Sequence, residues 1–202
     1  HSKGVNSFSF SPYGKTIASA SNDKTVKLWD INTGREIKTF KEHNREVNSV
    51  SFSPGGKTIA SASNDKTVKL WNINTGKEIK TFKGNDREVT SINFSPDGKI
   101  IASALAKLSP PTNNKFKLWD VSTGREITTL QVSKSFISNI SFSPDGKAIA
   151  SISNDGQIIL WNFDLESLLN KGCELIGNYL EHNPDISKSD KQVCNGINDQ
   201  KR

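Results

Sequence analysis

The 202-residue chain has no methionine and only two cysteines. Cys173 and Cys194 have only His182 near them, so the four ligands of a structural zinc site are missing. We expect two thiols in a reducing cytoplasm, with a disulfide between them as the alternative. No segment approaches the ~18 apolar residues of a membrane span, and no basic segment followed by an apolar one marks a secretory signal. We therefore expect a cytoplasmic chain without membrane contact.

Apolar residues are also scarce, at 33% of the chain. Serine, threonine, asparagine and glycine take their place, which is typical of proteins with many short strands and tight turns. The net charge of +6 comes from 27 basic and 21 acidic residues that alternate along the chain. This interleaving favours an ordinary solvated surface over a nucleic-acid patch, which stays open as an alternative.

What the chain has instead is a fourfold internal repeat. Its tryptophans, at 29, 71, 119 and 161, are spaced by 42, 48 and 42 residues. The phenylalanines of its Phe-Ser-Pro triplets, at 10, 52, 94 and 142, are spaced by 42, 42 and 48. One insertion of six residues between Phe94 and Trp119 explains both series. Residues 5–43 and 47–85 are identical at 33 of 39 positions, which indicates a duplication.

Each repeat has the alternating pattern of β-strands. In the second repeat the pattern predicts strands at 47–52, 58–62, 67–71 and 78–82, separated by turns rich in glycine, asparagine and aspartate. Four short antiparallel strands in about 42 residues predict the blade of a β-propeller, so the fold class is all-β. In the last repeat we expect strands at 136–142, 148–152 and 157–161, with no fourth strand after them.

Several motifs resemble those of the WD-repeat family. They are Val-Lys-Leu-Trp-Asp at 26–30, Ala-Ser-Ala-Ser-Asn-Asp at 18–23, and Ser-Pro-Asp-Gly-Lys at 95–99 and 143–147. The resemblance covers residues 1–163, which we assign to four propeller blades, and leaves 164–202 as a C-terminal extension. It implies a rigid ring that displays sites for protein partners, without catalytic residues, cofactor or metal.

The resemblance also implies a hydrogen-bonded set of histidine, serine, aspartate and tryptophan in each blade. A buried indole, imidazole and carboxylate all need partners, and such a set supplies them. The matching residues are His1, Ser19, Asp23 and Trp29 in the first blade, His43, Ser61, Asp65 and Trp71 in the second, and Ser151, Asp155 and Trp161 in the fourth. Asn85 and Ser133 replace the histidine in the third and fourth blades. The set repeats and is interior, so we do not interpret it as a hydrolase triad.

Basic residues recur at two turns of the repeat. Lys15, Lys57, Lys99 and Lys147 end the first turn, and Arg35, Lys77 and Arg125 lie in the third. In a propeller these turns emerge at the same end of the blades, so the cations form a ring there. Plain solvation is one interpretation, and binding of acidic partners or nucleic-acid phosphates is the other.

The insertion at 104–114 should project from the opposite end. Loops that interrupt a repeat often carry function. We expect Leu105 and Leu108 to be exposed there and, with Lys107, Arg45 and Arg87, to be candidate partner contacts; a neutral surface loop is the alternative.

The tail changes to a helical pattern of leucines after Phe163, which predicts one helix or two short ones. Leu-Leu-Asn-Lys-Gly-Cys at 168–173, Tyr-Leu-Glu-His-Asn-Pro at 179–184 and Val-Cys-Asn-Gly-Ile at 193–197 resemble the C-terminal extension of cyanobacterial WD-repeat proteins. Many of those carry an NTPase module upstream, so the resemblance implies a role in signal transduction.

Together these observations predict a non-catalytic protein-interaction scaffold, the C-terminal part of a larger signalling or regulatory protein. A nucleic-acid-binding module and a sensor domain of an NTPase are the alternatives. We expect the four blades to belong to a larger ring. The strands at 5–10 and 157–161 would then be open edges of the fragment, through which it could self-associate.

Overall fold

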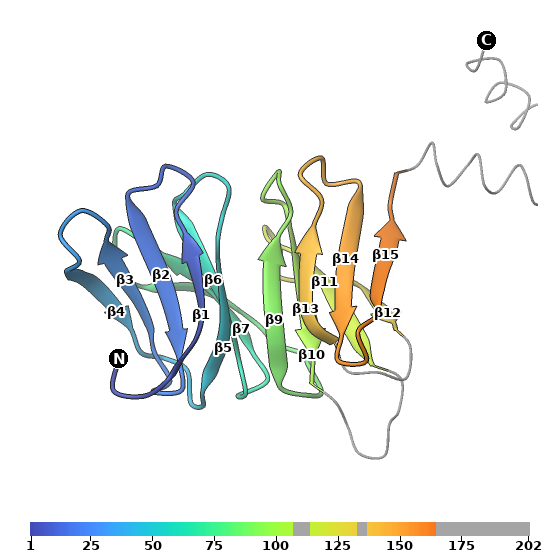
Figure 1. The fold of residues 1–202 in the computed structure, drawn as a ribbon, viewed down its shortest axis with the longest axis horizontal. Helices are drawn as coiled ribbons and strands as arrows, with labels where there is room; N and C mark the ends of the chain where they lie inside the picture. Colours follow the sequence, from blue (N-terminus) through green and yellow to red (C-terminus); the bar gives the residue numbers. More distant parts are fainter. Residues whose placement is uncertain (107–113, 133–136, 165–202) are drawn as a thin grey trace, which may run out of the picture. The chain divides into compact units, whose positions relative to one another are not determined.

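The computed structural model describes residues 1–106, 114–132 and 137–164. Fifteen strands and no helix occupy these ranges (Figure 1). The chain divides into two compact units, His1–Leu160 and Trp161–Arg202. Within the described residues there is no helix long and apolar enough to cross a membrane. The predicted tail helix, Cys173 and Cys194 lie outside the described residues, so those predictions stay open.

The strands form four antiparallel sheets, one for each repeat, in which successive strands are neighbours. The first sheet contains β1 (Val5–Phe10), β2 (Thr16–Ser21), β3 (Val26–Asp30) and β4 (Glu36–Phe40). The second contains β5 (Val47–Phe52), β6 (Thr58–Ser63), β7 (Val68–Asn72) and β8 (Glu78–Phe82). The third contains β9 (Val89–Phe94), β10 (Ile100–Leu105), β11 (Lys115–Asp120) and β12 (Glu126–Gln131). The fourth contains β13 (Ile137–Phe142), β14 (Ala148–Ser153) and β15 (Ile158–Asn162).

These sheets are the blades of a β-propeller, as the repeat predicts. In the second blade the predicted fourth strand has the observed bounds, while β6 is one residue longer than predicted and β7 lies one residue later. The fourth blade has three strands in the described residues, close to the predicted positions.

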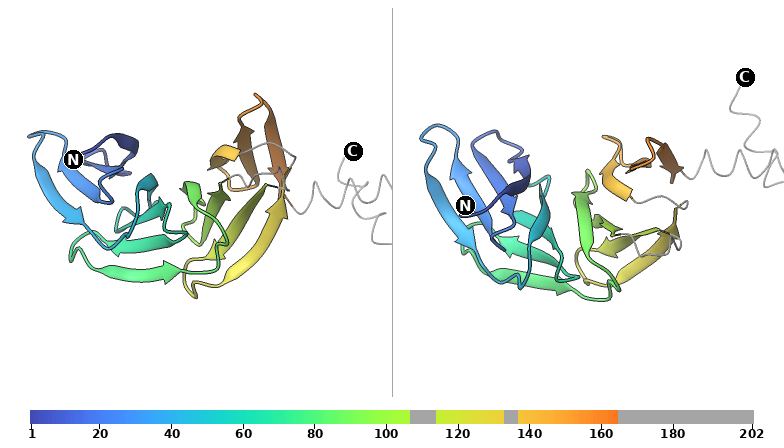
Figure 2. Two further views of the ribbon diagram at one scale, coloured as in Figure 1. Left: turned by 90° about the horizontal axis from the view of Figure 1, so that it is seen from below. Right: turned by 60° about the horizontal axis from the view of Figure 1, so that its bottom comes forward.

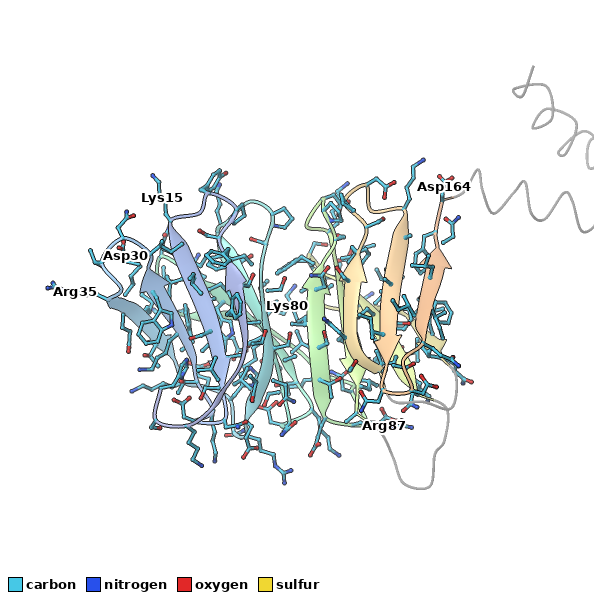
Figure 3. All side chains as sticks on the ribbon, in the orientation of Figure 1. Lys15, Asp30, Arg35, Lys80, Arg87 and Asp164 are labelled. Atoms are coloured by element: carbon cyan, nitrogen blue, oxygen red, sulfur yellow. The ribbon has the colours of Figure 1, made fainter. Side chains whose placement is uncertain are left out.

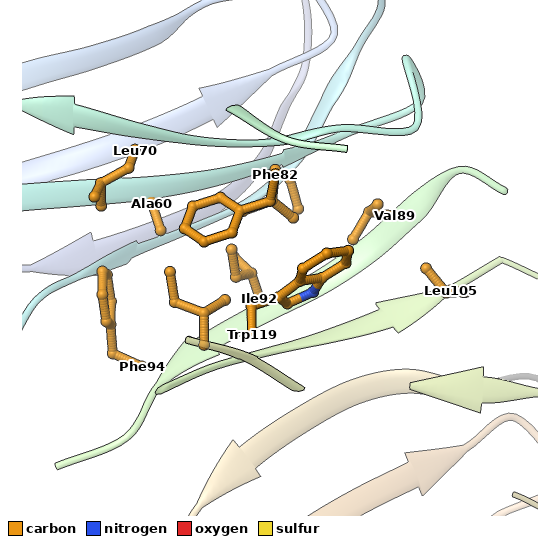
Figure 4. Packing of buried hydrophobic residues seen from close by; sticks show 11 residues of the cluster. Ala60, Leu70, Phe82, Val89, Ile92, Phe94, Leu105 and Trp119 are labelled. Carbon is orange, nitrogen blue, oxygen red and sulfur yellow. The ribbon is translucent and has the colours of Figure 1, made fainter. Parts of the chain in front are cut away.

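Consecutive blades of the first unit pack through their innermost strands. Strands β1, β5, β9 and β13 lie side by side in chain order (Figure 2). One core cluster joins Ala18, Val26, Leu28 and Phe40 of the first blade to Val47, Val50, Phe52, Ile59 and Trp71 of the second. The next cluster repeats this arrangement one blade further, with Leu70 and Phe82 packed against Ile92, Phe94 and Trp119 (Figure 4). The hydrophobic core thus lies between blades.

Two turn types recur, the first in all four blades and the second in the first, second and fourth. In the first, the Ser11 carbonyl accepts a hydrogen bond from Gly14 N–H at 2.9 Å, and Gly14 has a φ of 65° that favours glycine. In the second, between strands two and three, Lys24 and Lys66 hold φ angles of 71° and 69°, although lysine pays a steric penalty there. The fourth blade has Gly156 at this position, with a φ of 82°.

Candidate functional site

The second blade joins its four predicted residues in one chain of hydrogen bonds. His43 Nδ1 lies 2.8 Å from Asp65 Oδ2, and His43 Nε2 lies 2.7 Å from Ser61 Oγ. Trp71 Nε1–H donates to the same hydroxyl at 2.8 Å. Since Ser61 Oγ accepts from the indole, its own proton can go to Nε2, and Nδ1–H then donates to the acceptor-only carboxylate. A neutral imidazole satisfies every partner in this arrangement.

The carboxylate of this set also organises the adjacent turn. Asp65 accepts hydrogen bonds from Thr67 N–H at 3.0 Å and Asn44 N–H at 3.1 Å. Burial raises the pKa of Asp65, but the hydrogen bonds from His43, Thr67 and Asn44 outweigh it and hold that pKa well below its usual range. The set therefore fixes two loops to one carboxylate.

The first blade repeats this geometry. His1 Nδ1 lies 2.8 Å from Asp23 Oδ2, His1 Nε2 lies 2.7 Å from Ser19 Oγ, and Trp29 Nε1–H donates to Ser19 Oγ at 2.7 Å. In both blades the serine is buried, and its oxygen already has two partners. Both serine hydroxyls thus take part in hydrogen bonds within the set, and the set holds the strands and loops of the blade together.

The third blade keeps only part of the set. Trp119 Nε1–H donates to Ser103 Oγ at 2.8 Å. Ser103 was not named from the sequence, although it lies 42 residues after Ser61 and the repeat could have revealed it. Asn85 takes the place of the histidine, and both polar atoms of its side chain are buried without a hydrogen-bond partner in the part of the chain that the structure describes.

Two further side chains at this end of the third blade have buried polar atoms without a hydrogen-bond partner among the described residues. They are Asn114, which lies directly before β11, and Arg87, which lies directly before Glu88 and β9. Arg87 Nε lies 3.7 Å from the Asp86 carboxylate, an ion pair too long for a hydrogen bond. A buried polar group without a partner lowers the stability of the fold by about 1–3 kcal/mol. This end of the blade therefore has donors and acceptors that are available for further hydrogen bonds.

In the fourth blade, Ser151 and Asp155 make hydrogen bonds to residues of their own blade. Ser151 Oγ donates to the Ile159 carbonyl at 3.4 Å, and Asp155 Oδ1 accepts from Gln157 N–H at 3.3 Å and from the Ser153 hydroxyl. Trp161 lies in the second unit. Ser133 lies outside the described residues.

The prediction that Leu105 is an exposed apolar residue of the insertion is wrong. This residue ends β10, is buried, and pairs with Val89 in the sheet. The alignment had assigned it to the insertion, but it occupies the position of Ser63 in the repeat and packs into the core (Figure 4). Lys107 and Leu108 lie outside the described residues. Arg45 is exposed, and its Nη1 lies 3.6 Å from Glu88 Oε1.

At the opposite end of the blades, the first and third turns lie together. Ile31 N–H donates to the Lys15 carbonyl at 3.1 Å, and Ile73 and Val121 make the same bond to Lys57 and Lys99. All seven basic residues assigned to these turns are exposed, and Lys15 and Arg35 extend from this end in Figure 3. All seven cations are thus exposed on their turns, and their role in binding stays a prediction.

Carboxylates interrupt this basic ring. Asp120 accepts hydrogen bonds from Ser122 and Thr123, which hold its pKa at about 2, so it carries a full charge. Between the third and fourth blades a pocket is lined by Asp97, Asp145 and Phe142, among others. Acidic side chains thus divide the cationic surface, which makes it less suited to bind a continuous row of phosphates. No group of three or more metal-ligating side chains is found in the part of the chain that the structure describes.

The fold and the repeated sets define a class, the β-propellers built from tandem four-stranded blades. Family comparison assigns the four repeats to WD40, described as "WD domain, G-beta repeat", with matches at residues 1–30, 34–72, 76–120 and 124–162. The chain belongs to this family.

Individual relatives match over about one blade. The chain is 48% identical over 44 residues to a "Ribosome biogenesis protein BOP1 homolog" of Drosophila virilis, which is 22% of this chain and 6% of that protein. It is 51% identical over 43 residues to a "Notchless protein homolog" of Arabidopsis thaliana, 21% of this chain and 9% of that protein. It is 52% identical over 40 residues to "Ribosome assembly protein 4" of Saccharomyces cerevisiae, 20% of this chain and 8% of that protein. The matches thus span less than a tenth of each relative.

Proposed function

We propose that this chain is a non-catalytic scaffold that binds a protein partner at the end of the blades opposite the basic turns. The third blade differs from the first two at this end. In the first two blades the set residues at this end are hydrogen-bonded, whereas Asn85, Arg87 and Asn114 have buried polar atoms without a hydrogen-bond partner among the described residues. A departure that costs stability without a structural return is a sign of function.

The chemistry at this end favours an acidic partner segment. The exposed Arg45 of the second blade offers a guanidinium to such a segment. Arg87 is buried, so its Nε and Nη1 donors reach a partner only after the residues that cover them move aside. A partner carboxylate can accept two parallel bonds from one guanidinium, which gives direction as well as energy. Asp86 and Glu88 lie beside these arginines, and a partner carboxylate would displace their longer ion pairs. A rigid blade loses little conformational entropy on binding, so a few such contacts suffice.

A displayed library of random peptides, selected on the 202-residue chain, tests this function. We expect enriched peptides to contain aspartate or glutamate, and Arg45→Met with Arg87→Met to weaken their binding at least tenfold, the equivalent of about 1.4 kcal/mol. Lys57→Met with Lys77→Met, at the opposite end, is the matched control and should leave binding unchanged. The proposal fails if no peptide is enriched, or if only the control pair weakens binding.

The sequence of the tail supports a role for this scaffold within a larger protein. Its motifs at 168–173, 179–184 and 193–197 resemble extensions of cyanobacterial WD-repeat proteins with signalling NTPase modules. We propose that the scaffold serves as a regulatory part of a protein of this kind. The names of the relatives, which refer to ribosome biogenesis and assembly, support the coarser role of holding partners together. The coding sequence upstream tests the setting, because a nucleotide-binding motif is expected there.

A further inference from the structure

The turns between the first and second strands of neighbouring blades contact each other at the basic end of the first unit. An added Cβ at Gly56 would lie 3.5 Å from Pro12 Cδ of the first blade, and one at Gly146 would lie 3.5 Å from Pro96 Cδ of the third. The turns of the second and third blades make the same contact. The three blade interfaces can therefore be compared position by position at this end.

The pocket between the third and fourth blades lies where two of these turns meet, the turn from β9 to β10 and the turn from β13 to β14 (Figure 1). Its volume is about 410 Å³. Ligand sites in proteins have volumes of about 300–1,000 Å³, so this pocket has room for one long side chain or a molecule of similar size. Every lining residue belongs to the first unit and to the described part of the two blades that form the pocket.

The lining combines apolar side chains with two carboxylates. Ile100 and Phe142 provide apolar surface, and Asp97 and Asp145 provide the carboxylates. Asp97 Oδ1 accepts hydrogen bonds from a serine hydroxyl at 2.6 Å and from a backbone N–H at 3.0 Å, both in its own turn. Asp145 Oδ1 accepts the same two bonds in the next turn, at 2.5 and 3.0 Å. These bonds lower the pKa of both carboxyl groups, so the pocket carries two negative charges at neutral pH.

The other two blade interfaces of the first unit lack this combination. Tyr13 occupies the position of Asp97 in the first blade, and its ring packs against the turn of the second blade. Gly55 occupies that position in the second blade, and Thr58 occupies the position of Ile100. In chain order, the interfaces therefore have no, one and two carboxylates at this position. The pocket with apolar surface and two charges is particular to the third and fourth blades.

We propose that this pocket binds the side chain of an arginine in a partner polypeptide. The guanidinium would meet the carboxylates of Asp97 and Asp145, and the methylene groups would lie against Ile100 and Phe142. A guanidinium has five N–H donors in one plane, so it can donate to two carboxylates at the same time. It is also less strongly hydrated than a lysine ammonium and stacks on aromatic rings, which suits a pocket lined by a phenylalanine. A metal ion fits less well, because no group of three or more metal-ligating side chains occurs among the described residues.

The lysines around the pocket restrict which arginine can enter it. Lys99 is exposed, and its Nζ lies 3.9 Å from Asp97 Oδ2, so the two atoms form no hydrogen bond that an arginine would have to break. Lys99 and Lys147 belong to the basic ring, which repels a uniformly basic segment. An arginine flanked by acidic residues fits best, because its neighbours can contact the ring while its guanidinium enters the pocket. This site lies at the end of the blades opposite the proposed function and does not depend on it.

An NMR titration of the 202-residue chain tests the proposal with the peptide Gly-Glu-Gly-Arg-Gly-Glu-Gly, blocked at both ends. We expect the backbone amides of Gly98 and Gly146 to shift, while those of Gly14 and Gly56 in the equivalent turns stay in place. The same peptide with citrulline in place of arginine keeps the shape of the side chain but not its charge. It should bind at least about tenfold more weakly, because hydrogen bonds between charged groups are about twice as strong as neutral ones.

The repeats supply variants that these turns tolerate. Asp97→Tyr introduces the residue of the first blade and fills the pocket with a ring, and Asp145→Gly introduces the residue of the second blade and removes a carboxylate. Each variant should weaken binding of the arginine peptide at least about tenfold. Asp30→Asn is the matched control, because it removes one negative charge at the same end of the first blade, where the second blade has Asn72. It should leave binding unchanged.

Shifts at the turns of the third and fourth blades that both pocket variants remove, and that the control retains, support the proposal. Absence of binding at about millimolar peptide overturns it, as does equal affinity for the citrulline peptide. An equal loss in Asp30→Asn would show that the net charge of this end, and not the pocket, attracts the peptide. Binding that Arg45→Met with Arg87→Met removes would place the peptide at the opposite end, and this result also overturns the proposal.

Discussion

At the scale of the residue, the histidine sets differ between blades in a way that stability measurements can detect. Asp65→Ala removes the acceptor of His43, Thr67 and Asn44, and should reduce the free energy of unfolding by about 1–3 kcal/mol. Asn85→Ala removes an amide that has no hydrogen-bond partner among residues 1–106, 114–132 and 137–164, so its cost should be clearly smaller. Urea denaturation of both variants makes the comparison, and equal losses would contradict the role given to the carboxylate.

The left-handed lysines offer a substitution that should stabilise the chain. Lys66 is exposed with a φ of 69°, at the position that Gly156 occupies in the fourth blade. Lys66→Gly relieves the clash of Cβ but adds freedom to the unfolded chain, so we expect a net gain of up to about 1 kcal/mol. The reverse change, Gly156→Lys, should lower stability by a similar amount. Thermal unfolding measures both, and a stability loss in Lys66→Gly would show that its conformation is unstrained.

At the scale of the element, the blades were predictable from the sequence because the period of two and the period of 42 residues agree. The positions of the strands could be predicted from this pattern, whereas the end of β10 could not. Leu105 was assigned to the insertion because no local pattern marks where a repeat resumes after extra residues. The burial of Arg87 was also not predictable, since its equivalent Arg45 is likewise followed by Glu-Val and is exposed. Such differences depend on what the neighbouring blade places beside each side chain.

The turns between the first two strands of each blade allow a test of nucleic-acid binding. Reversal of Lys15, Lys57, Lys99 and Lys147 to glutamate should leave the fold intact, because all four side chains are exposed. If this end binds nucleic acid, the reversal should abolish binding of single-stranded DNA or RNA, and wild-type binding should weaken steeply with added salt. The carboxylates Asp97, Asp120 and Asp145 at this end lead us to expect no wild-type binding at physiological salt. Tight binding that the reversal removes would instead favour the nucleic-acid function.

At the scale of the whole molecule, the carboxyl groups whose pKa values are shifted all change the pH dependence of stability in the same direction. Hydrogen bonds and nearby lysines lower the pKa values of ten aspartate and glutamate side chains across the described residues, including Asp23, Asp65 and Asp120. A carboxyl group whose folded pKa lies below its unfolded value stabilises the fold above the unfolded value, which is about 4. That stabilisation is lost as the pH falls through the lower, folded value.

The chain should therefore hold its stability from neutral pH to about pH 4 and lose it progressively toward pH 2. The net charge, already +6 at pH 7, rises over the same interval, and the added repulsion between basic turns acts in the same direction. Asp65→Asn should lower stability at neutral pH. It should also flatten the fall in stability below pH 4, because the substitution removes a carboxyl group with a strongly lowered pKa. Urea denaturation at a series of pH values measures this slope. A free energy of unfolding that stays constant down to about pH 2, or that falls as steeply in Asp65→Asn as in the wild type, would show that these hydrogen-bonded carboxylates do not stabilise the propeller.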